Sequence, residues 1–140
     1  MIVPIRGAAR IFEASSRRFS ASPSHSQIKT ITQGVTFDTI AREWRFKWSP
    51  DNEKASLAAA QKVLESFKGR VKAVPGVKSV QRVVCGGCHD FKVIVALDAA
   101  KFGAWDAAKF APEQEFLEAI EAIPGLTKLE TQTFTLQPVE

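Results

Sequence analysis

The sequence predicts an α+β fold in which one antiparallel sheet of four strands carries helices on one face. Two observations lead to this prediction. Residues 39–48 and 91–97 place apolar side chains as β-strands do, by alternation or in a short continuous run. Residues 51–74 and 113–123 instead repeat them every three or four positions, the spacing of an amphipathic helix. The predicted order is β-α-β-β-α-β.

The first strand is predicted at residues 39–48, because its even-numbered positions form an apolar face. Arg42 interrupts that face, whose apolar members are Ile40, Trp44, Phe46 and Trp48. Ser49, Pro50 and Asp51 then supply a cap, a proline for the first helical position and an acid for the first turn. The strand is therefore expected to lead directly into a helix.

That helix has an apolar stripe whose members are three or four positions apart: Leu57, Ala60, Leu64, Phe67, Val71 and Val74. Pro75-Gly76 ends it. A hairpin follows, with strands at residues 77–84 and 91–97 and a two-residue turn at Gly86-Gly87. Both faces of its second strand are apolar, which is typical of a strand that is covered on both sides.

Two shorter helices and a last strand complete the predicted domain. Asp98 is a cap for a helix through Phe102 and Trp105, and Pro112 opens the next helix. In that helix the inward residues are expected to be Phe116, Ile120 and Ile123, and the outward ones Glu113, Glu118 and Glu121. The final strand is predicted at residues 126–136.

One layer of helices covers only one face of the sheet, and no sequence remains to cover the other. The apolar third strand and the tryptophan-rich first strand nevertheless indicate that both faces are buried. A second copy of the chain is the simplest cover, so we expect a homodimer joined sheet to sheet.

Residues 1–19 have the features of a mitochondrial presequence, being rich in Arg and Ser and able to form an amphipathic helix. Arg17-Arg18-Phe19 resembles a processing site, with cleavage after Phe19. Residues 20–37 are small and polar and are expected to be a flexible lead-in. We therefore expect a mitochondrial location, most simply the matrix. The alternative is a disordered basic tail that binds an acidic partner.

The basic character of the chain belongs to this N-terminal part. Residues 1–37 hold five basic residues against one acidic residue, which accounts for the whole formal net charge of +4. The remaining residues are neutral overall, so the composition does not favour nucleic acid as a partner. No stretch has the roughly 18 apolar residues needed to span a membrane.

Several short motifs resemble the stress-responsive A/B barrel (Dabb) domains, a family of dimeric α/β barrel proteins. They are Phe46-Lys47-Trp48-Ser49-Pro50-Asp51, Val-Pro-Gly-Val at 74–77, the apolar third strand, and Ala-Pro-Glu-Gln-Glu-Phe at 111–116. The resemblance covers about residues 38–137. It implies a ferredoxin-like protomer that pairs through its sheet into a barrel.

Family members that act as polyketide cyclases use histidines that this chain lacks. The resemblance aligns their His-Pro-x-His segment with Ala111-Pro112-Glu113-Gln114, their first-strand histidine with Arg42, and an acid of the last strand with Thr133. Because Ala and Gln cannot exchange a proton near neutral pH, the cyclase chemistry does not carry over. The absence of these histidines favours a non-catalytic homodimeric module that binds a small molecule or acts in a stress response. An enzyme of cyclase or monooxygenase type, acting on a small apolar carbonyl compound, stays open.

The candidate ligand site consists of Arg42, Trp44, Trp48, Trp105 and Gln114. The tryptophans could line a pocket between helices and sheet for a small apolar compound, with Arg42 as its polar anchor. The alternative, which we favour, is that the tryptophans are core and interface residues and that Arg42 pairs with a carboxylate at the sheet edge.

The motif Cys85-Gly86-Gly87-Cys88-His89 has the letters of a c-type haem attachment site. The only other candidate axial ligands are Met1 and His25, so we expect no haem and no other cofactor. Zinc would need ligands from a second chain. A labile disulfide is possible across the turn, where α-carbons lie about 5.5 Å apart. Two free thiols in a reducing compartment remain the favoured interpretation.

Overall fold

The computed structural model describes residues 28–140. Its elements in chain order are β1 (Lys29–Thr32), β2 (Val35–Phe37), β3 (Thr39–Lys47), α3 (Asp51–Lys72), β4 (Val77–Val84), β5 (Asp90–Asp98), α4 (Ala99–Ala107), α5 (Glu113–Glu121) and β6 (Thr127–Leu136). None of the described helices combines the length and the hydrophobicity that crossing a bilayer requires.

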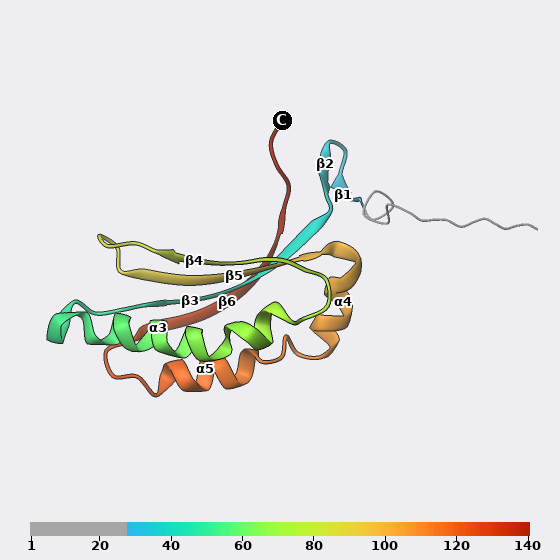
Figure 1. Cartoon of the computed structure of the whole chain (residues 1–140). Helices are drawn as coiled ribbons and strands as arrows, with labels where there is room; N and C mark the ends of the chain where they lie inside the picture. Colours follow the sequence, from blue (N-terminus) through green and yellow to red (C-terminus); the bar gives the residue numbers. More distant parts are fainter. Residues whose placement is uncertain (1–27) are drawn as a thin grey trace, which may run out of the picture.

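The four long strands form one antiparallel sheet in the order β4-β5-β3-β6; α3 and α5 lie along one of its faces, with α4 at one end of the sheet (Figure 1). This arrangement confirms the predicted α+β, ferredoxin-like fold class. The central pair is β3 and β5, which runs in unbroken register from Thr39 opposite Asp98 to Lys47 opposite Asp90. The sheet and its helices therefore span residues 39–136.

The core lies between the sheet and the helix layer, where the predicted apolar faces meet. From the sheet come Trp44, Phe46, Phe91, Val93, Val95 and Leu97, and from the helices Ala60, Leu64, Val71, Phe102, Trp105, Phe116 and Ile120. Asp98 caps α4 as predicted, because its Oδ1 accepts a hydrogen bond of 2.9 Å from the Ala100 N–H. The three- and four-residue spacings therefore identified the buried helix faces correctly.

The other face of the sheet has no helix over it, and its side chains form three rows across the strands. The first row is small or apolar: Ser79, Ala96, Ala41 and Phe134. The second contains Gln81, Ile94, Glu43 and Gln132, and the third contains Val83, Lys92, Arg45 and Glu130. We call these twelve residues the open face. The side chains of the open face become more polar from the first row to the third.

Helix α3 begins differently from the prediction. Pro50 lies before the first helical residue, and Ser49 Oγ accepts a hydrogen bond of 3.0 Å from the Asp51 N–H. Residues 52–54 then adopt left-handed backbone, with φ between 54° and 62°, before the right-handed helix continues. Left-handed backbone is unfavourable for residues with a side chain, so propensity alone does not predict such a turn.

The turn between β4 and β5 is longer than the predicted two residues. The Cys85 N–H donates to the Asp90 carbonyl at 3.0 Å, which leaves residues 86–89 as a four-residue turn. His89 closes it with φ at 63°, a conformation that the Gly-Gly pair alone did not indicate. The two cysteines therefore lie within and beside the turn rather than on paired strands.

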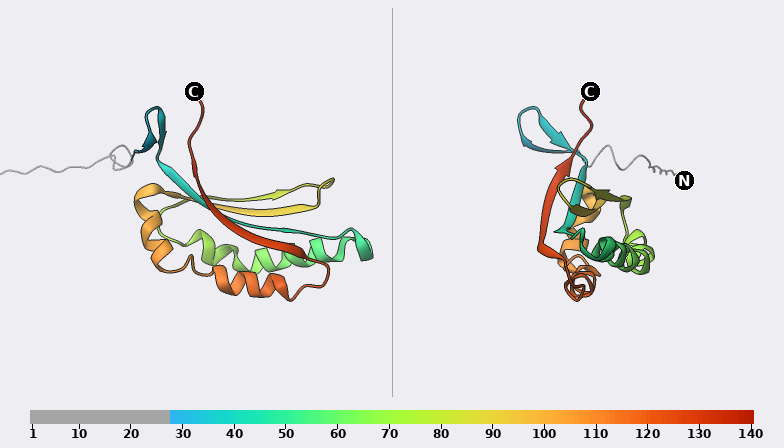
Figure 2. Two further views of the ribbon diagram at one scale, coloured as in Figure 1. Left: turned by 180° about the vertical axis from the view of Figure 1, so that it is seen from behind. Right: turned by 90° about the vertical axis from the view of Figure 1, so that its left-hand side faces the viewer.

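Residues 29–37 form a hairpin of their own, β1 paired with β2, and are therefore not part of the flexible lead-in predicted for residues 20–37. β-branched residues on both sides of Gly34, which has φ at 83°, favour this hairpin. It projects, together with the C-terminal residues, on the side of the sheet away from the helices (Figures 1 and 2). The predicted presequence, residues 1–19, lies outside the described residues, as do residues 20–27.

Candidate functional site

Arg42 lies on the helix-facing side of β3, where it forms four hydrogen bonds. Its Nε and one terminal nitrogen donate to the two oxygens of Glu113 at 2.8 and 3.2 Å. The terminal nitrogens also donate to Thr133 Oγ1 at 2.9 Å and Thr131 Oγ1 at 3.0 Å. The guanidinium carbon lies 4.1 Å from the centre of the Phe110 ring. Four of the five N–H groups of the Arg42 guanidinium are therefore used within its own chain.

Glu113 joins this arginine to Trp44. Its Oε1 accepts a hydrogen bond of 2.6 Å from Trp44 Nε1 as well as the bond from Arg42. The Arg42 and Glu113 side chains are only 15% and 14% exposed. Because a desolvated carboxylate and guanidinium need partners, this Arg42-Glu113-Trp44 cluster is a structural connection between β3 and the start of α5.

The position of Glu113 corrects one detail of the prediction for α5, whose inward residues Phe116 and Ile120 were predicted correctly. Glu113 was expected to face outward with Glu118 and Glu121, but its carboxylate reaches the sheet. It lies three and seven positions before Phe116 and Ile120, which are both buried. Gln114, the residue chosen from the family motif, instead points outward and donates to Glu118 Oε2 at 3.2 Å. The hydrogen-bond partner of Arg42 on α5 is thus Glu113, one residue before the predicted site residue Gln114.

The three tryptophans divide between two places. Trp105 packs beside Trp44, with ring centres 6.5 Å apart, and its Nε1 donates to the Ala111 carbonyl at 2.8 Å. Trp48 directly follows the other end of β3, where its ring packs against the His89 ring at an angle of 52° with centres 4.7 Å apart. All three are buried. They pack into the fold and do not line one common pocket, as the favoured alternative predicted.

An apolar groove runs between the end of α3 and α4, beside Trp105. Its volume is about 430 Å³, and its lining includes Val74, Pro75, Ala104 and Ala108. Lys101 is the charged residue at its wall. The groove is separate from the polar cluster, because neither Arg42 nor Glu113 lines it. A small apolar molecule is the kind of ligand that such a lining fits.

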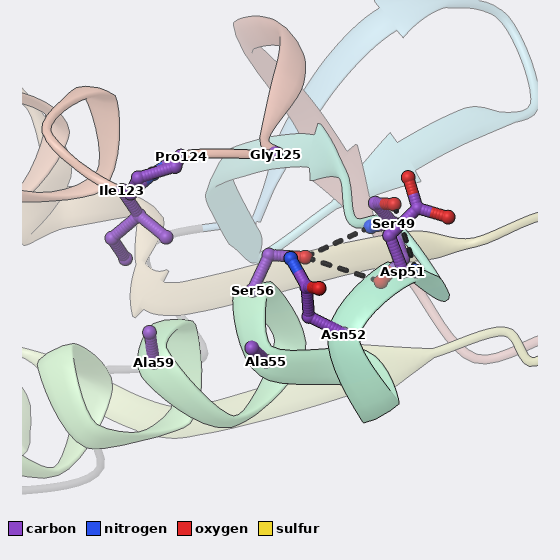
Figure 3. A pocket seen from close by; sticks show the side chains of 9 residues that line it. All are labelled: Ser49, Asp51, Asn52, Ala55, Ser56, Ala59, Ile123, Pro124 and Gly125. Atoms are coloured by element: carbon purple, nitrogen blue, oxygen red, sulfur yellow. Dashed lines mark hydrogen bonds between the residues drawn. The ribbon is translucent and has the colours of Figure 1, made fainter.

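A second surface pocket, of about 340 Å³, lies at the start of α3 (Figure 3). Ala55, Ala59 and Gly125 form part of its wall. The buried Ser56 hydroxyl is already used, because it accepts from the Ser49 N–H at 2.9 Å and donates to the Ser49 carbonyl at 3.3 Å. None of the predicted site residues lines this pocket, and its polar groups support the local turn.

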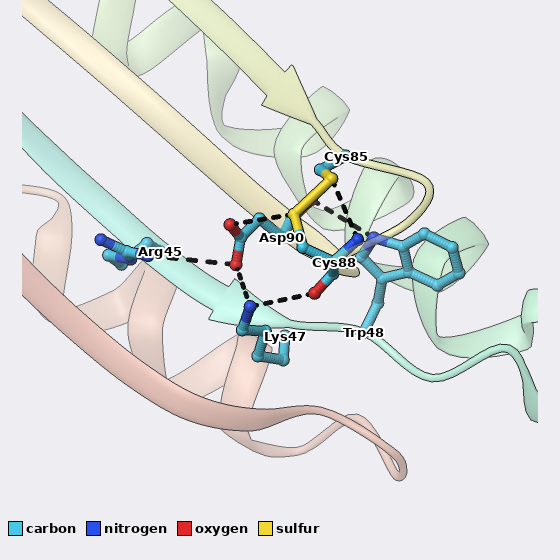
Figure 4. Close-up of a disulfide and its surroundings, with 6 residues drawn as sticks. All are labelled: Arg45, Lys47, Trp48, Cys85, Cys88 and Asp90. Carbon is cyan, nitrogen blue, oxygen red and sulfur yellow. Dashed lines mark hydrogen bonds and ion pairs between the residues drawn. A yellow bond between two sulfur atoms is a disulfide. The ribbon is translucent and has the colours of Figure 1, made fainter.

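Cys85 and Cys88 form a disulfide across the β4–β5 turn (Figure 4). The structure thus corrects the favoured interpretation of two free thiols and agrees with the alternative of a disulfide. Their α-carbons are 5.6 Å apart, within the range that a disulfide spans. In the part of the chain that the structure describes, no group of three acidic, Cys or His side chains is arranged to bind a metal ion.

Charged side chains surround the disulfide. Lys47 Nζ donates to the Cys88 carbonyl at 2.9 Å and pairs with the Asp90 carboxylate at 2.7 Å. The hydrogen bond from Lys47 is the main reason why the pKa of Asp90 lies below its usual value. Arg45 adds a second positive charge 3.9 Å from the same carboxylate. Asp90 is therefore ionised at neutral pH.

The chain resembles several solved structures that share its fold. No protein-family model matches it, and no curated protein does. A proposed antibiotic biosynthesis monooxygenase from Deinococcus radiodurans aligns at 12% identity and a TM-score of 0.55, over 72% of this chain and 95% of that one.

Two further structures agree with the first. A point mutant of SnoaB, a cofactor-independent oxygenase from Streptomyces nogalater, aligns at 17% identity and a TM-score of 0.51 over 73% and 96% of the two chains. The NE2512 protein of unknown function from Nitrosomonas europaea aligns at 20% identity and a TM-score of 0.51 over 74% and 94%. The chain therefore has the ferredoxin-like fold found in antibiotic biosynthesis monooxygenase-type domains.

Proposed function

We propose that the protein is a stress-response A/B barrel protein of the mitochondrial matrix that works as a non-catalytic homodimer. In this proposal, the helix side of the sheet is closed by packing and the open face binds a second copy of the chain. The observation that carries the proposal is the contrast between these two faces of one sheet.

The contacts on the helix side of the sheet support a structural role for Arg42. A polar group that binds a substrate must be free to exchange its partners, but the Arg42 guanidinium already donates to Glu113, Thr131 and Thr133. Opening this site would leave charged groups without partners in a poorly solvated place, which costs several kcal/mol. The arginine therefore stabilises the protomer instead of anchoring a ligand.

The open face supports pairing with a second copy. Ala41 and Ala96 lie side by side at its apolar end and are already buried within one chain, while Phe134 beside them is only partly covered. At its centre, Glu43 is 3% exposed and accepts a hydrogen bond of 2.8 Å from Gln132 Nε2. The charged end has both signs, Lys92 and Arg45 beside Glu130, so two copies related by a twofold axis can match charges as well as apolar surface.

The dimer is tested by placing a lysine at Ile94, the partly buried residue opposite Glu43 in the centre of the open face. Glu43 can pair with this lysine inside one protomer, so we expect the variant to fold. In a dimer the new charges would be desolvated, which costs roughly 3 kcal/mol and weakens association by about 100-fold. Sedimentation of the full chain measures this change.

The matched control is Ala58→Lys, which adds the same charge on the exposed side of α3. We expect this control and the unaltered chain to sediment as dimers and Ile94→Lys to sediment as a folded monomer, with unchanged circular dichroism. An unaltered chain that stays monomeric, or an Ile94→Lys chain that stays dimeric, contradicts the proposed interface.

The mitochondrial part of the proposal rests on residues 1–19, with Arg6, Arg10, Arg17 and Arg18 against one acid. A fluorescent protein fused after residue 140 is expected in the matrix and, after purification, to begin at Ser20. The variant with Arg17→Gln and Arg18→Gln is expected to be imported without being cut at that bond, because the processing site is lost. A full-length fusion that stays in the cytosol contradicts the assignment.

A cyclase- or monooxygenase-like enzyme acting on a small apolar carbonyl compound is the second candidate. The groove beside Trp105 favours it, because its apolar lining suits such a compound. Catalysis is less well supported, since Lys101 is the titratable side chain of that lining and the polar cluster lies elsewhere. The groove therefore supports binding of a small molecule more than a reaction on it.

A further inference from the structure

The turn between β4 and β5 carries chemistry that the proposed dimer does not use. This turn, which contains the Cys85–Cys88 disulfide (Figure 4), lies at the end of the sheet far from α4 (Figure 1). Cys88 is exposed and Cys85 is half-buried. A thiol from solution can therefore reach one sulfur more easily than the other.

The hairpin does not depend on this disulfide. Only two residues separate the cysteines, so the bond restricts the unfolded chain less than a long loop would. Strand pairing continues to Val84 opposite Phe91, and the Cys85 N–H donates to the Asp90 carbonyl at 3.0 Å. The Trp48 ring also supports the turn, because its Nε1 donates to the same carbonyl at 3.3 Å. Reduction can therefore take place without unfolding.

The two sulfurs have different surroundings. Cys85 Sγ lies 3.0 Å from the Cys88 backbone nitrogen, whose N–H points to it and would stabilise a negative charge on that sulfur. Cys88 Sγ lies 3.3 Å from Asp90 Oδ2, a carboxylate that would destabilise a negative charge there. Lys47 holds this carboxylate in place at 2.7 Å. Cys85 is thus the better leaving group, and Cys88 the sulfur that is open to attack.

We propose that Cys85 and Cys88 form a reversible dithiol–disulfide pair that exchanges two electrons with a dithiol protein or a small dithiol. The incoming thiolate attacks Cys88 Sγ, the bond between the two cysteines breaks, and Cys85 leaves as a thiolate that takes a proton from water. The second thiol of the reductant then attacks the mixed disulfide and releases Cys88. The reductant ends as a disulfide, having given up two electrons and two protons.

The fluorescence of Trp48 can report this exchange. Its ring packs against His89, the residue next to Cys88. A change in the turn on reduction would alter the surroundings of Trp48, while Trp44 and Trp105 lie in the core away from it. The fluorescence of the full chain should therefore follow the state of the two thiols, and Trp48→Phe should remove that response.

The test titrates the full chain with buffers of oxidised and reduced dithiothreitol and counts free thiols by alkylation and mass spectrometry. We expect both cysteines to become reactive in one two-electron step, with a parallel fluorescence change and an unchanged circular dichroism spectrum. Thiols that stay free in the most oxidising buffer would overturn the proposal. So would cysteines that pair only between two chains, or a disulfide that persists in excess reduced dithiothreitol.

The roles of the two sulfurs are tested separately with single cysteines. In the Cys85→Ser chain we expect Asp90→Asn to speed alkylation of Cys88 about five- to tenfold, because it removes the adjacent negative charge. Asp106→Asn, at an exposed site on α4, is the matched control and should leave the rate unchanged. Equal rates with and without Asp90→Asn would overturn the assigned asymmetry. The exchange proposal does not rest on the dimer, because it needs only the two cysteines and the groups of the same chain around them.

Discussion

Glu113→Ala is expected to lower the free energy of unfolding by about 3–5 kcal/mol. The substitution removes both acceptors of the Arg42 bonds at 2.8 and 3.2 Å, and the acceptor of the Trp44 bond at 2.6 Å. Arg42 would stay charged in a site where its side chain is only 15% exposed. Urea unfolding followed by tryptophan fluorescence, at one fixed protein concentration, measures the loss.

Three further chains test the cause of that loss. Glu121→Ala makes the same change at the exposed end of α5 and should alter the stability by less than about 0.5 kcal/mol. Glu113→Gln keeps the shape and should cost about 1–3 kcal/mol. Arg42→Met combined with Glu113→Leu should recover part of the loss, because apolar residues can replace a poorly solvated ion pair. Equal stability of Glu113→Ala and Glu121→Ala would show that the cluster contributes little.

The fold could be predicted from this sequence because its apolar spacing agrees with its turn residues. The stripe from Leu57 to Val74 ends at Pro75-Gly76, as a helix should. The structure differs from the predicted fold where the sequence carries little information about the local backbone. Residues 52–54 all have side chains, so a left-handed backbone was not expected there. The small polar residues from Ser20 onward led to the prediction of a flexible lead-in, although the residues on both sides of Gly34 form the β1–β2 hairpin.

The candidate site was predicted only in part. Arg42 could be predicted as a site residue because its charge interrupts an apolar face, and the structure places it against a carboxylate as the favoured alternative expected. The carboxylate belongs to a helix and not to the sheet edge. Glu113 could have been found from its spacing to Phe116 and Ile120, since all three share one helix face. The alignment with a histidine motif led to Gln114 instead.

The redox state of the two cysteines could not be predicted, for a different reason. The Gly-Gly turn brought the two residues close in the prediction, and the distance between their α-carbons, 5.6 Å, agrees with it. Sequence alone could not decide between thiols and disulfide, because the choice depends on contacts made in space. Asp90 and Lys47 come from different strands, and their pairing at 2.7 Å gives the two sulfurs unequal surroundings.

Phe116→Ala is expected to lower the free energy of unfolding by about 3–5 kcal/mol through loss of packing, with no polar group involved. The Phe116 ring is fully buried, with its centre 4.9 Å from that of Trp44 and 5.6 Å from that of Phe67. Phe116→Leu fills most of the space and should cost less than about 1.5 kcal/mol. Leu117→Ala, on the half-buried side of α5, should cost about 1 kcal/mol. If Phe116→Ala is no worse than Leu117→Ala, α5 does not pack against β3 through this ring, and the closed helix side on which the non-catalytic proposal rests would be open to a ligand.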